Sequence, residues 1–452
     1  MIPIVTPAEM AAIDAAAPEP VDVLIERAGA AVAWAARRML GGTYGRVVHV
    51  IVGPGNNGND GRVAARRLAE WGVRTHVHDA AMTADTLAPG DLVIDAAFGT
   101  GFRDTWHPPD VAGAPVLAVD IPSGVDGLTG ATAGHVLTAT RTVTFAALKP
   151  GLVLPPGRWL AGEVEVADIG LAVGPTRAHL VTAADVEDLW PRRGSDAHKW
   201  RQAVRVVAGS AGMTGAAHLA AAAAQRSGAG MVTLSIPGDL GEAGPVEVVR
   251  RPVPAAGWAD DVLAGAERDH AIVIGPGLGR RESTVAAVRR VVTDAVLPIV
   301  IDGDALFAVA WHEAGGAGWL RRRRGPTVLT PHDGEFGLLT GAQPDTDRIQ
   351  AGRRLAADTR SVVVLKGPTT VVASPDGDVR VVTSGDHRLA TAGTGDVLAG
   401  IIGAVLAAGV DGFDAATAAA WVHGAASHLG PVTGLVASDL LEAIPHVVGG
   451  LA

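Results

Sequence analysis

The feature that most constrains the fold of this chain is a repeated alternation of uninterrupted apolar runs with helical segments. In residues 1–170 the apolar runs are RVVHVIVG, VRTHVHD, DLVIDAAFG, PVLAVDIPSG and RTVTFAAL. Helical patterns such as LIERAGAAVAWAARRML and GRVAARRLAEWG accompany them. Val- and Ile-rich runs of this length are typical of strands that are buried on both faces of a parallel sheet. We therefore predict an N-terminal, Rossmann-like, doubly wound α/β domain.

A second alternation of the same kind occupies the rest of the chain. Its apolar runs are AVRVVAGS, MVTLSIP, HAIVIGPGLG, PIVIDGDAL, TVLTPH, SVVVLKG, TTVVAS and DVRVVTSG. The strand pattern stops near Gly174 and Pro175, and a chain of 452 residues is too long for one ordinary core. We predict two domains, residues 1–174 and 175–452, both built of alternating strands and helices.

Composition excludes several classes of function. The chain has no cysteine, which removes disulfides, thiolate nucleophiles and cysteine-ligated metals. A formal net charge of −10 argues against nucleic-acid binding. The N-terminus lacks a signal-peptide pattern, and the apolar run at 397–410 is shorter than the roughly 20 residues that cross a bilayer. We predict a cytoplasmic protein that binds neither membranes nor nucleic acids.

A strand, a glycine and asparagine loop and a helix follow one another in VVHVIVGPGNNGNDGRVAARRL. Glycines at 53, 55, 58 and 61 would allow positive φ angles and bring backbone N–H groups toward an anion at the helix start. This pattern predicts a ligand that carries phosphate. A tight turn that binds no ligand is the alternative explanation for the same residues.

Two later strands of the first half each end in an aspartate. Asp95 precedes a second glycine loop, and Asp120 is followed by Pro122, Ser123 and Gly124. Oxygen-bearing side chains at converging strand ends could coordinate a hard cation or serve acid/base chemistry. A capping or turn role for either aspartate stays open.

These segments resemble the NAD(P)H-hydrate epimerase family, whose members carry a GxGNNGGDG loop, a DAxFGTG segment and a DIPSG segment in this order. The resemblance implies that the hydrated dinucleotide is contacted by Asn56, Asn57, Gly58, Asn59, Asp60, Gly99, Thr100, Gly101, Phe102, Arg103, Asp104 and Thr105. It implies a potassium ion held by Asn57, Asp95 and Ser123. It also implies that Asp120 is the catalytic group against the reacting ring, with Lys149 nearby.

In the second half, TAGTGDVLAGIIGAV places Gly393, Gly395 and Asp396 at the start of an apolar helix. Backbone N–H groups and the helix dipole converge there, with a carboxylate beside them. Phosphoryl transfer to a hydroxyl needs such donors and a carboxylate that accepts the hydroxyl proton. A glycine-rich helix start with Asp396 as a simple cap is the alternative.

Other strand ends of this half carry further glycine loops and polar residues. VVAGSAGMTGAA and VIGPGLG are two more loops, VLTPHDGEF contains His332 and Glu335, and VVVLKGPTT contains Lys366. Alone, His332 is more often a structural histidine and Lys366 a surface lysine. The sequence has no HExxH and no GKS/T loop, which disfavours zinc hydrolases and P-loop NTPases. We therefore expect magnesium to be brought by a nucleotide.

These motifs resemble the nucleotide-dependent NAD(P)H-hydrate dehydratases of the ribokinase-like superfamily, an α/β/α fold, over residues 180–452. The resemblance implies that the hydrate is contacted by Ala216, Gly277, His332 and Asp396. It implies that the adenine nucleotide is contacted by Lys366, Gly367, Pro368, Thr369, Thr370 and Gly395. Asp396 would deprotonate the 6-hydroxyl of the hydrate, a phosphoryl group would move to that oxygen, and phosphate would leave to regenerate the ring double bond.

Together the two resemblances imply a bifunctional enzyme that epimerises the R and S hydrates of NADH and NADPH and dehydrates the S form. ADP, the nucleotide of similar bacterial enzymes, is expected rather than ATP, with release of AMP and phosphate. The alternative is a ribokinase-like small-molecule kinase fused to a non-catalytic dinucleotide-binding module. The alanine-rich opening helix could be a subunit contact, so we also expect a homo-oligomer.

Two positions depart from the family patterns. Asn59 stands where the epimerase family has glycine, and asparagine is the residue that best tolerates positive φ after glycine. Trp200 follows His198 and Lys199 where glycine is usual in the dehydratases. We expect the tryptophan to alter local packing rather than chemistry.

Overall fold

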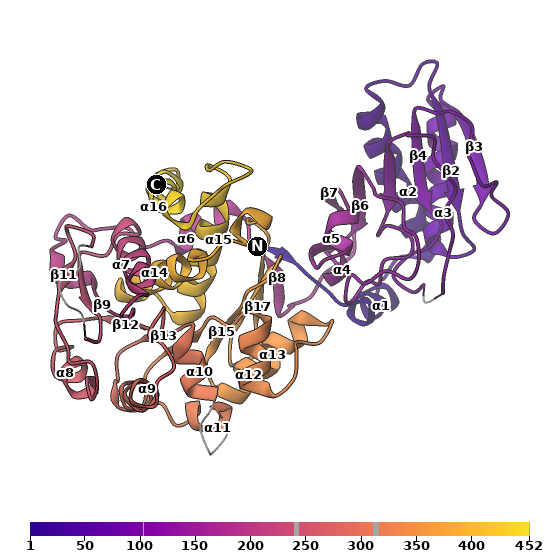
Figure 1. Ribbon diagram of the computed structural model, residues 1–452. Coiled ribbons are helices and arrows are strands. Elements are labelled where there is room, and N and C mark those ends of the chain that lie inside the picture. The colour runs from indigo at the N-terminus through magenta and orange to yellow at the C-terminus, as the bar shows by residue number, and fades with distance from the viewer. Residues whose placement is uncertain (103, 239–243, 311–315, 452) are drawn as a thin grey trace. The chain divides into compact units, whose positions relative to one another are not determined.

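The computed structural model describes residues 1–452 except 103, 239–243, 311–315 and 452. The chain forms two compact units, Ile2–Ala178 and, together with Met1, the residues from His179 onward. The sequence-based boundary near residue 174 falls in the connection between β7 (Glu163–Ala167) and β8 (Ala178–Leu180). Figure 1 shows that each unit contains its own sheet and its own helices.

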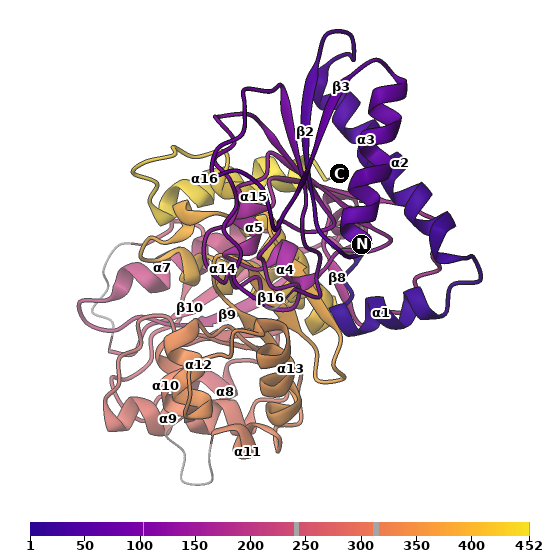
Figure 2. The same cartoon turned by 90° about the vertical axis from the view of Figure 1, so that its right-hand side faces the viewer.

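The sheet of the N-terminal unit consists of parallel strands in the order β3-β2-β4-β5-β6-β7. The first five in chain order are β2 (Val47–Val52), β3 (Arg74–Asp79), β4 (Leu92–Ala96), β5 (Val116–Val119) and β6 (Arg141–Phe145). Helices α2 (Val21–Leu40) and α3 (Asn56–Glu70) pack together on one face (Figure 2). Short helices are α1 (Pro7–Ala15), α4 (Pro150–Val153) and α5 (Gly157–Leu160). The opposite face buries a second apolar cluster that includes Ile51, Val93 and Trp106.

The sheet of the C-terminal unit has the order β8-β17-β16-β15-β14-β13-β12-β9-β10-β11. Its strands are β9 (Ala203–Val207), β10 (Met231–Ser235), β11 (Val249–Arg250), β12 (Ala271–Ile274), β13 (Ile299–Ile301), β14 (Thr327–Leu329), β15 (Val362–Leu365), β16 (Thr370–Ala373) and β17 (Val379–Val382). Strands β9 to β15 pair in parallel, whereas β15, β16 and β17 pair antiparallel. The antiparallel edge follows from short connections, because a parallel crossover needs a dozen or more residues.

Helices cover both faces of this second sheet. One face carries α7 (Thr214–Arg226), α14 (Thr394–Ala407), α15 (Gly412–Ser427) and α16 (Ala437–Gly449), and the other carries α9 (Glu282–Asp294), α10 (Asp304–Ala310), α12 (Asp333–Thr340) and α13 (Arg348–Thr359) (Figure 1). Smaller helices are α6 (Ala183–Leu189), α8 (Ala259–Ala264) and α11 (Gly316–Leu320). The α/β/α architecture predicted for this half is confirmed.

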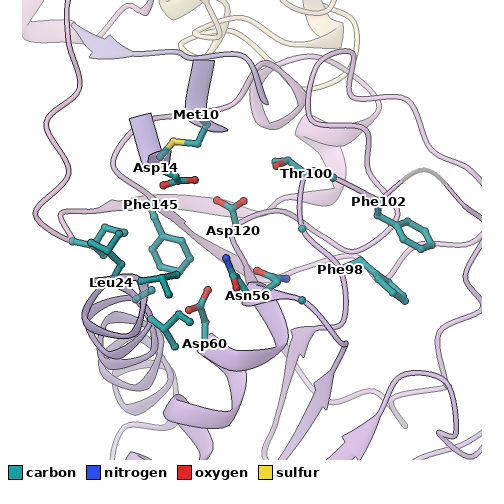
Figure 3. Close-up of a pocket in the computed structure, with 18 of the residues that line it drawn as sticks. Met10, Asp14, Leu24, Asn56, Asp60, Phe98, Thr100, Phe102, Asp120 and Phe145 are labelled. Atoms are coloured by element: carbon teal, nitrogen blue, oxygen red, sulfur yellow. The ribbon is translucent and has the colours of Figure 1, made fainter. Parts of the chain in front are cut away.

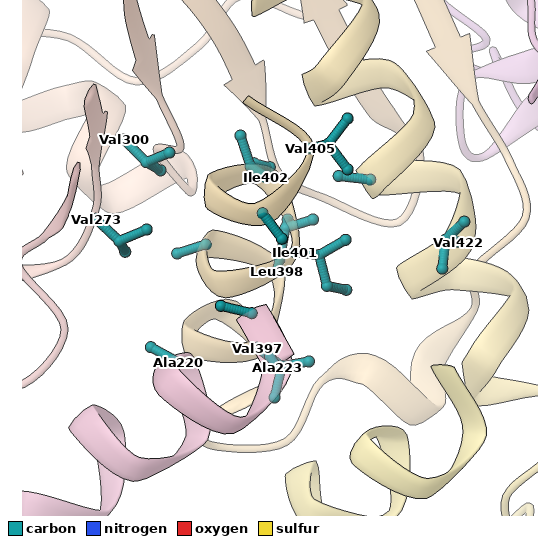
Figure 4. Close-up of a cluster of buried hydrophobic side chains, with 14 of the residues drawn as sticks. Ala220, Ala223, Val273, Val300, Val397, Leu398, Ile401, Ile402, Val405 and Val422 are labelled. Carbon is teal, nitrogen blue, oxygen red and sulfur yellow. The ribbon is translucent and has the colours of Figure 1, made fainter. Parts of the chain in front are cut away.

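Helix α14 is the centre of the larger core (Figure 4). Its side chains at Val397, Ile401 and Ile402 are fully buried, and two glycines let neighbouring elements approach it closely. A Cβ at Gly400 would lie 2.2 Å from the Ala220 carbonyl oxygen, and one at Gly403 would lie 2.3 Å from a methyl of Val273. This packing holds the N-terminus of α14 in one place. Within the described ranges no helix is both long and apolar enough to span a membrane.

Candidate active sites

A cavity of about 520 Å³ lies at the carboxyl ends of β2, β4 and β5 in the N-terminal unit (Figure 3). Its wall includes the first turns of α3, the loop after β4, and Asp120 after β5. Apolar side chains from α1, α2 and β6 close another part of the wall, among them Met10, Leu24 and Phe145. The three strand ends singled out from the sequence therefore meet around one space, as expected for a parallel sheet.

Asp120 is held in this cavity by a buried lysine. Lys149 Nζ donates hydrogen bonds to Asp120 Oδ1 at 2.5 Å, to Thr144 Oγ1 at 2.8 Å and to the Phe145 carbonyl at 3.1 Å. Thr144 Oγ1 donates in turn to the same Asp120 oxygen at 3.0 Å. The backbone of Asp120 has a φ of 65°, an unfavourable angle for a residue with a side chain. The strain and the ion pair together fix the direction in which this carboxylate points.

Two further carboxylates, Asp14 on α1 and Asp60 on α3, face the same space (Figure 3). Burial raises the pKa of Asp60 to about 8, and the charges of Asp120 and Asp14 add to the effect. Burial also raises the pKa of Asp14, although Lys149 works in the opposite direction. The cavity therefore offers a protonated carboxyl group and an ion-paired carboxylate to one guest. The sequence analysis missed Asp14, because no motif surrounds it.

Asp95, in β4, is fully buried, and neither it nor Ser123 is among the residues that line the cavity. It accepts hydrogen bonds from the Ser123 backbone N–H at 2.9 Å and from Ser123 Oγ at 2.6 Å. Ser123 Oγ also accepts from the Phe98 N–H at 2.8 Å. Nearby, the amide nitrogen of Asn57 is buried without a hydrogen-bond partner, which is costly unless a guest supplies an acceptor. Carboxylate, hydroxyl and amide oxygens of this kind fit a hard cation.

The glycine loop before α3 differs from the expectation in one respect. None of the glycines at 53, 55, 58 and 61 has a φ in the left-handed region, so that part of the prediction is wrong. Three of them are needed for close approach instead, since a Cβ at Gly53 would lie 1.8 Å from the Ala97 carbonyl oxygen, one at Gly58 2.0 Å from that of Gly53, and one at Gly61 2.5 Å from the Ala96 Cβ. A Cβ at Gly55 would meet nothing within 4 Å. Helix α3 begins at Asn56, so Asn59 is helical and does not need the freedom of glycine.

The remaining predicted contact residues of this half divide into three groups. Those that line the cavity are Asn56, Asn57, Asp60, Gly99, Thr100, Gly101 and Phe102. Those outside its lining are Gly58, Asn59, Asp104 and Thr105. Arg103 lies outside the described residues. The Asp104 carboxylate accepts the N–H of Thr105 at 2.8 Å, so in this structure it caps its own loop.

The C-terminal site is centred on the start of α14. Gly393 precedes the helix with a φ of 92°, and Asp396 lies in its first turn. Burial raises the pKa of Asp396 to about 7; Asp302 raises it further and Lys366 opposes the shift. At neutral pH this carboxyl group is therefore poised between its two protonation states, as a general base requires.

Lys366, at the end of β15, brings a positive charge to the same helix start. Its Nζ donates to Asp302 Oδ1 at 3.0 Å and lies 3.7 Å from Glu335 Oε2. A Cβ at Gly395 would lie 3.4 Å from this Nζ, so the ammonium group sits beside the first turn of α14. Burial alone would lower the pKa of Lys366, but Asp302 and Glu335 outweigh it and the pKa is raised. The lysine is a permanent cation at the point where N–H groups converge.

Asp302, buried after β13, positions this lysine and also accepts from Thr330 Oγ1 at 2.6 Å. The sequence analysis gave it no role. Its position directly after the apolar residues of PIVIDGDAL was the available signal, because ligands in parallel sheets lie at such strand ends.

The other predicted residues of the second half lie in nearby loops, except Ala216, in the first turn of α7, and Thr370, the first residue of β16. Gly277, with a φ of 61°, approaches Ala216 so closely that a Cβ on it would lie 3.0 Å from that of Ala216. His332 caps α12 by accepting the Glu335 N–H at 3.2 Å, and 60% of its side chain is exposed. In the run Gly367, Pro368, Thr369 and Thr370, which leads into β16, Thr369 is buried. His332 is thus both a helix cap and an accessible side chain.

Comparison with known proteins bears on both halves. Residues 204–446 match the NAD(P)H-hydrate dehydratase family, and residues 21–85 and 76–151 match the YjeF-related protein N-terminus. The bifunctional NAD(P)H-hydrate repair enzyme of Moorella thermoacetica is 35% identical, over 99% of this chain and 97% of that protein. The chain belongs to this repair-enzyme family. Other members are those of Mycobacterium tuberculosis, 39% identical over 83% of this chain and 82% of that protein, and Escherichia coli, 32% identical over 88% and 84%.

Solved structures agree with the ribokinase-like fold of the C-terminal unit. The ADP/ATP-dependent NAD(P)H-hydrate dehydratase of Bacillus subtilis, co-crystallised with ATP/Mg²⁺, is 31% identical with a TM-score of 0.50, and the match covers 60% of this chain and 98% of that one. A ribokinase-like superfamily protein of Enterococcus faecalis has a TM-score of 0.53 at 23% identity, over 62% of this chain and 99% of that one. The repair-enzyme family and its ribokinase-like half are therefore those expected from the sequence.

Proposed function

We propose that this member of the repair-enzyme family performs both activities, with epimerisation in the unit Ile2–Ala178 and nucleotide-dependent dehydration in the unit from His179 onward. One observation supports the assignment of dehydration to the unit from His179 onward. Asp396, with a pKa of about 7, shares the start of α14 with the ammonium group of Lys366. A base, a cation and converging N–H groups are the parts that phosphoryl transfer to a hydroxyl needs.

In the proposed dehydration, Asp396 accepts the proton of the 6-hydroxyl group of the S hydrate. The hydroxyl oxygen then takes a phosphoryl group from the nucleotide, while Lys366 and the Gly395 N–H stabilise the transferred charge. The C6–O bond breaks, phosphate departs, and loss of a proton from the neighbouring ring carbon restores the double bond. We propose ADP as the donor, which leaves as AMP. Magnesium, held mainly by the nucleotide phosphates, would neutralise part of their charge.

In the proposed epimerisation, Asp120 is the catalytic group, because it faces the cavity and Lys149 fixes its orientation. The protonated carboxyl of Asp60 donates a hydrogen bond to the hydrate. A potassium ion bound by oxygens of Asn57, Asp95 and Ser123 would add positive charge next to the substrate. The unpartnered amide of Asn57 supports a polar guest at this point.

The test uses the full chain with separately purified R and S hydrates of NADH and with ADP or ATP, and follows the recovery of reduced-nicotinamide absorbance. Asp396→Asn is expected to lower recovery from the S hydrate by at least 10³-fold, because it removes the base. R/S exchange should persist in this variant. Asp358→Asn, at an exposed position on α13, is the matched control and should keep both activities.

Three outcomes would contradict the proposal. Loss of R/S exchange in folded Asp396→Asn would contradict the division of labour between the units. A stable phosphorylated product would favour a small-molecule kinase instead. Equal rates without any nucleotide would exclude the phosphoryl-transfer route.

We also propose that the protein is cytoplasmic and forms a homo-oligomer. Cell fractionation tests the location, and sedimentation measurements test the oligomeric state.

A further inference from the structure

Three histidines lie together at the edge of the N-terminal sheet, away from the cavity residues. His76 and His78 are on the edge strand β3, two residues apart and therefore on the same face. Strands β2 and β3 are neighbours in the sheet (Figure 1), and His49 on β2 is directly opposite His76 in the register. Two such histidines on one strand and a third across from them put three imidazoles within reach of one point.

The rings are already close to one another. His49 Nδ1 and His78 Nε2 are 2.9 Å apart, and the centroid of the His49 ring is 5.2 Å from that of His76 and 5.1 Å from that of His78. His49 is buried, His78 is half-buried and His76 is exposed. One ring of the cluster, that of His49, is thus buried, and another, that of His76, is accessible to solvent.

The surroundings of His49 favour the tautomer whose Nδ1 lone pair faces His78. Its Nε2 is buried beside the carbonyls of Ala88 and Pro89 and makes no hydrogen bond of ordinary geometry. A proton on Nε2, near those carbonyls, leaves Nδ1 bare and facing His78. Burial lowers the pKa of both His49 and His78, so both rings are neutral at neutral pH and able to ligate.

We infer that His49, His78 and His76 form a binding site for a divalent transition-metal ion that prefers imidazole, Cu²⁺ or Ni²⁺ rather than Zn²⁺. With metal–nitrogen bonds of about 2.05 Å, the 2.9 Å between the two nitrogens corresponds to an angle of about 90° at the metal. This angle suits the tetragonal geometry of Cu²⁺ and Ni²⁺ better than the tetrahedral geometry of Zn²⁺.

The metal would replace the proton that now lies between the two rings, and that proton moves to Nδ1 of His78. In the described part of the chain no three histidine, cysteine, aspartate or glutamate side chains are already arranged around a metal position. The third ligand therefore requires the ring of His76 to turn, which its exposure allows. Bound metal would join the edge strand β3 to β2 and stabilise this edge of the sheet.

The experiment titrates chelator-treated full-length protein, without nucleotide, with Cu²⁺, Ni²⁺ and Zn²⁺ by calorimetry, and records the electron paramagnetic resonance of the Cu²⁺ form. We expect one site that binds Cu²⁺ and Ni²⁺ more tightly than Zn²⁺, with splitting from imidazole nitrogen. His78→Gln should weaken binding at least tenfold and His76→Gln by a smaller factor. His135→Gln, an exposed histidine of the same unit, is the control and should change nothing.

Epimerase activity and the melting temperature without metal confirm that each variant is folded, since none of these histidines lines the cavity. Bound Cu²⁺ should also raise the melting temperature of the wild type but not that of His78→Gln. Equal affinities of the wild type and His78→Gln, or imidazole splitting that survives this substitution, would overturn the inference.

Discussion

Asp60 keeps a proton near neutral pH because it is buried beside the charges of Asp120 and Asp14, which raises its pKa to about 8. In the unfolded chain the same group titrates near 3.8, so unfolding above that pH releases the proton. The free energy of unfolding of this unit therefore falls as the pH rises from about 4 to 8. A residue that we propose to bind the hydrate thus lowers stability at neutral pH.

We predict that Asp60→Asn, which keeps the shape of the side chain, stabilises the N-terminal unit at pH 8. The expected gain is about 1–2 kcal/mol, or roughly 2–8 °C in melting temperature, and it should be smaller at pH 5. Scanning calorimetry at the two pH values measures it, with the exposed Asp85→Asn as control. Equal gains at pH 5 and pH 8 would show that burial of the charge at Asp60 is not the cause.

In the proposed mechanism, Asp396 sets the pH dependence of the dehydration. As a base it must be ionised, and burial places its pKa at about 7. We predict that kcat/KM for the S hydrate falls about tenfold per pH unit below pH 7 and levels off above it. A pH profile at saturating nucleotide measures this, and a rate that stays constant down to pH 5 would remove Asp396 from the role of base.

Residues that lie within a motif could be found from the sequence, and residues that act through tertiary contact could not. Asp120 directly follows a strand and precedes the PSG segment, and Asp396 follows two glycines at a helix start, so their chemistry was visible. Asp14 reaches the cavity from a helix that carries no motif, and only the packing of α1 brings it there. The steric reason for glycine at position 53 could not be seen in the sequence either, because the Ala97 carbonyl that leaves no room for a Cβ there comes from a different strand end.

At the scale of elements, the central parallel strands were predictable because Val- and Ile-rich runs are buried on both faces. The run VRTHVHD differs, since it forms the edge strand β3 and is largely exposed. The run that forms β16 has the same composition as its neighbours, so its antiparallel direction was not visible in that composition. It depends on the short connection between Leu365 and Thr370. Connection length was therefore the better guide to strand direction at this edge.

Helix α14 places Asp396 correctly only if its glycines stay small. We predict that Gly400→Ala destabilises the C-terminal unit by about 1–3 kcal/mol, although alanine favours helices, because the new methyl would overlap the Ala220 carbonyl. Dehydration should fall more than epimerisation. Gly449→Ala, where a Cβ would meet nothing within 4 Å, is the control and should stay within about 0.5 kcal/mol. Urea unfolding and both assays measure the effects, and an unchanged Gly400→Ala would contradict the packing argument.

At the scale of the whole molecule, one parallel and one mostly parallel sheet each gather polar groups at the carboxyl ends of their parallel strands. One edge combines Asp120, Asp60 and Lys149, which suit proton chemistry at a neutral ring. The other combines Asp396 and Lys366 at a helix start, which suit phosphoryl transfer. One chain can therefore convert both hydrate forms, because the first unit supplies the S form that the second consumes.

The division of labour is tested most directly by complementation between two full-length variants. With pure R hydrate and ADP, neither Asp120→Asn nor Asp396→Asn should recover NADH faster than spontaneous R/S exchange allows. An equimolar mixture of the two should restore most of the wild-type initial rate, because each variant retains the site that the other lacks. A mixture no faster than the separate variants, with both proteins folded, would contradict the assignment of one reaction to each unit.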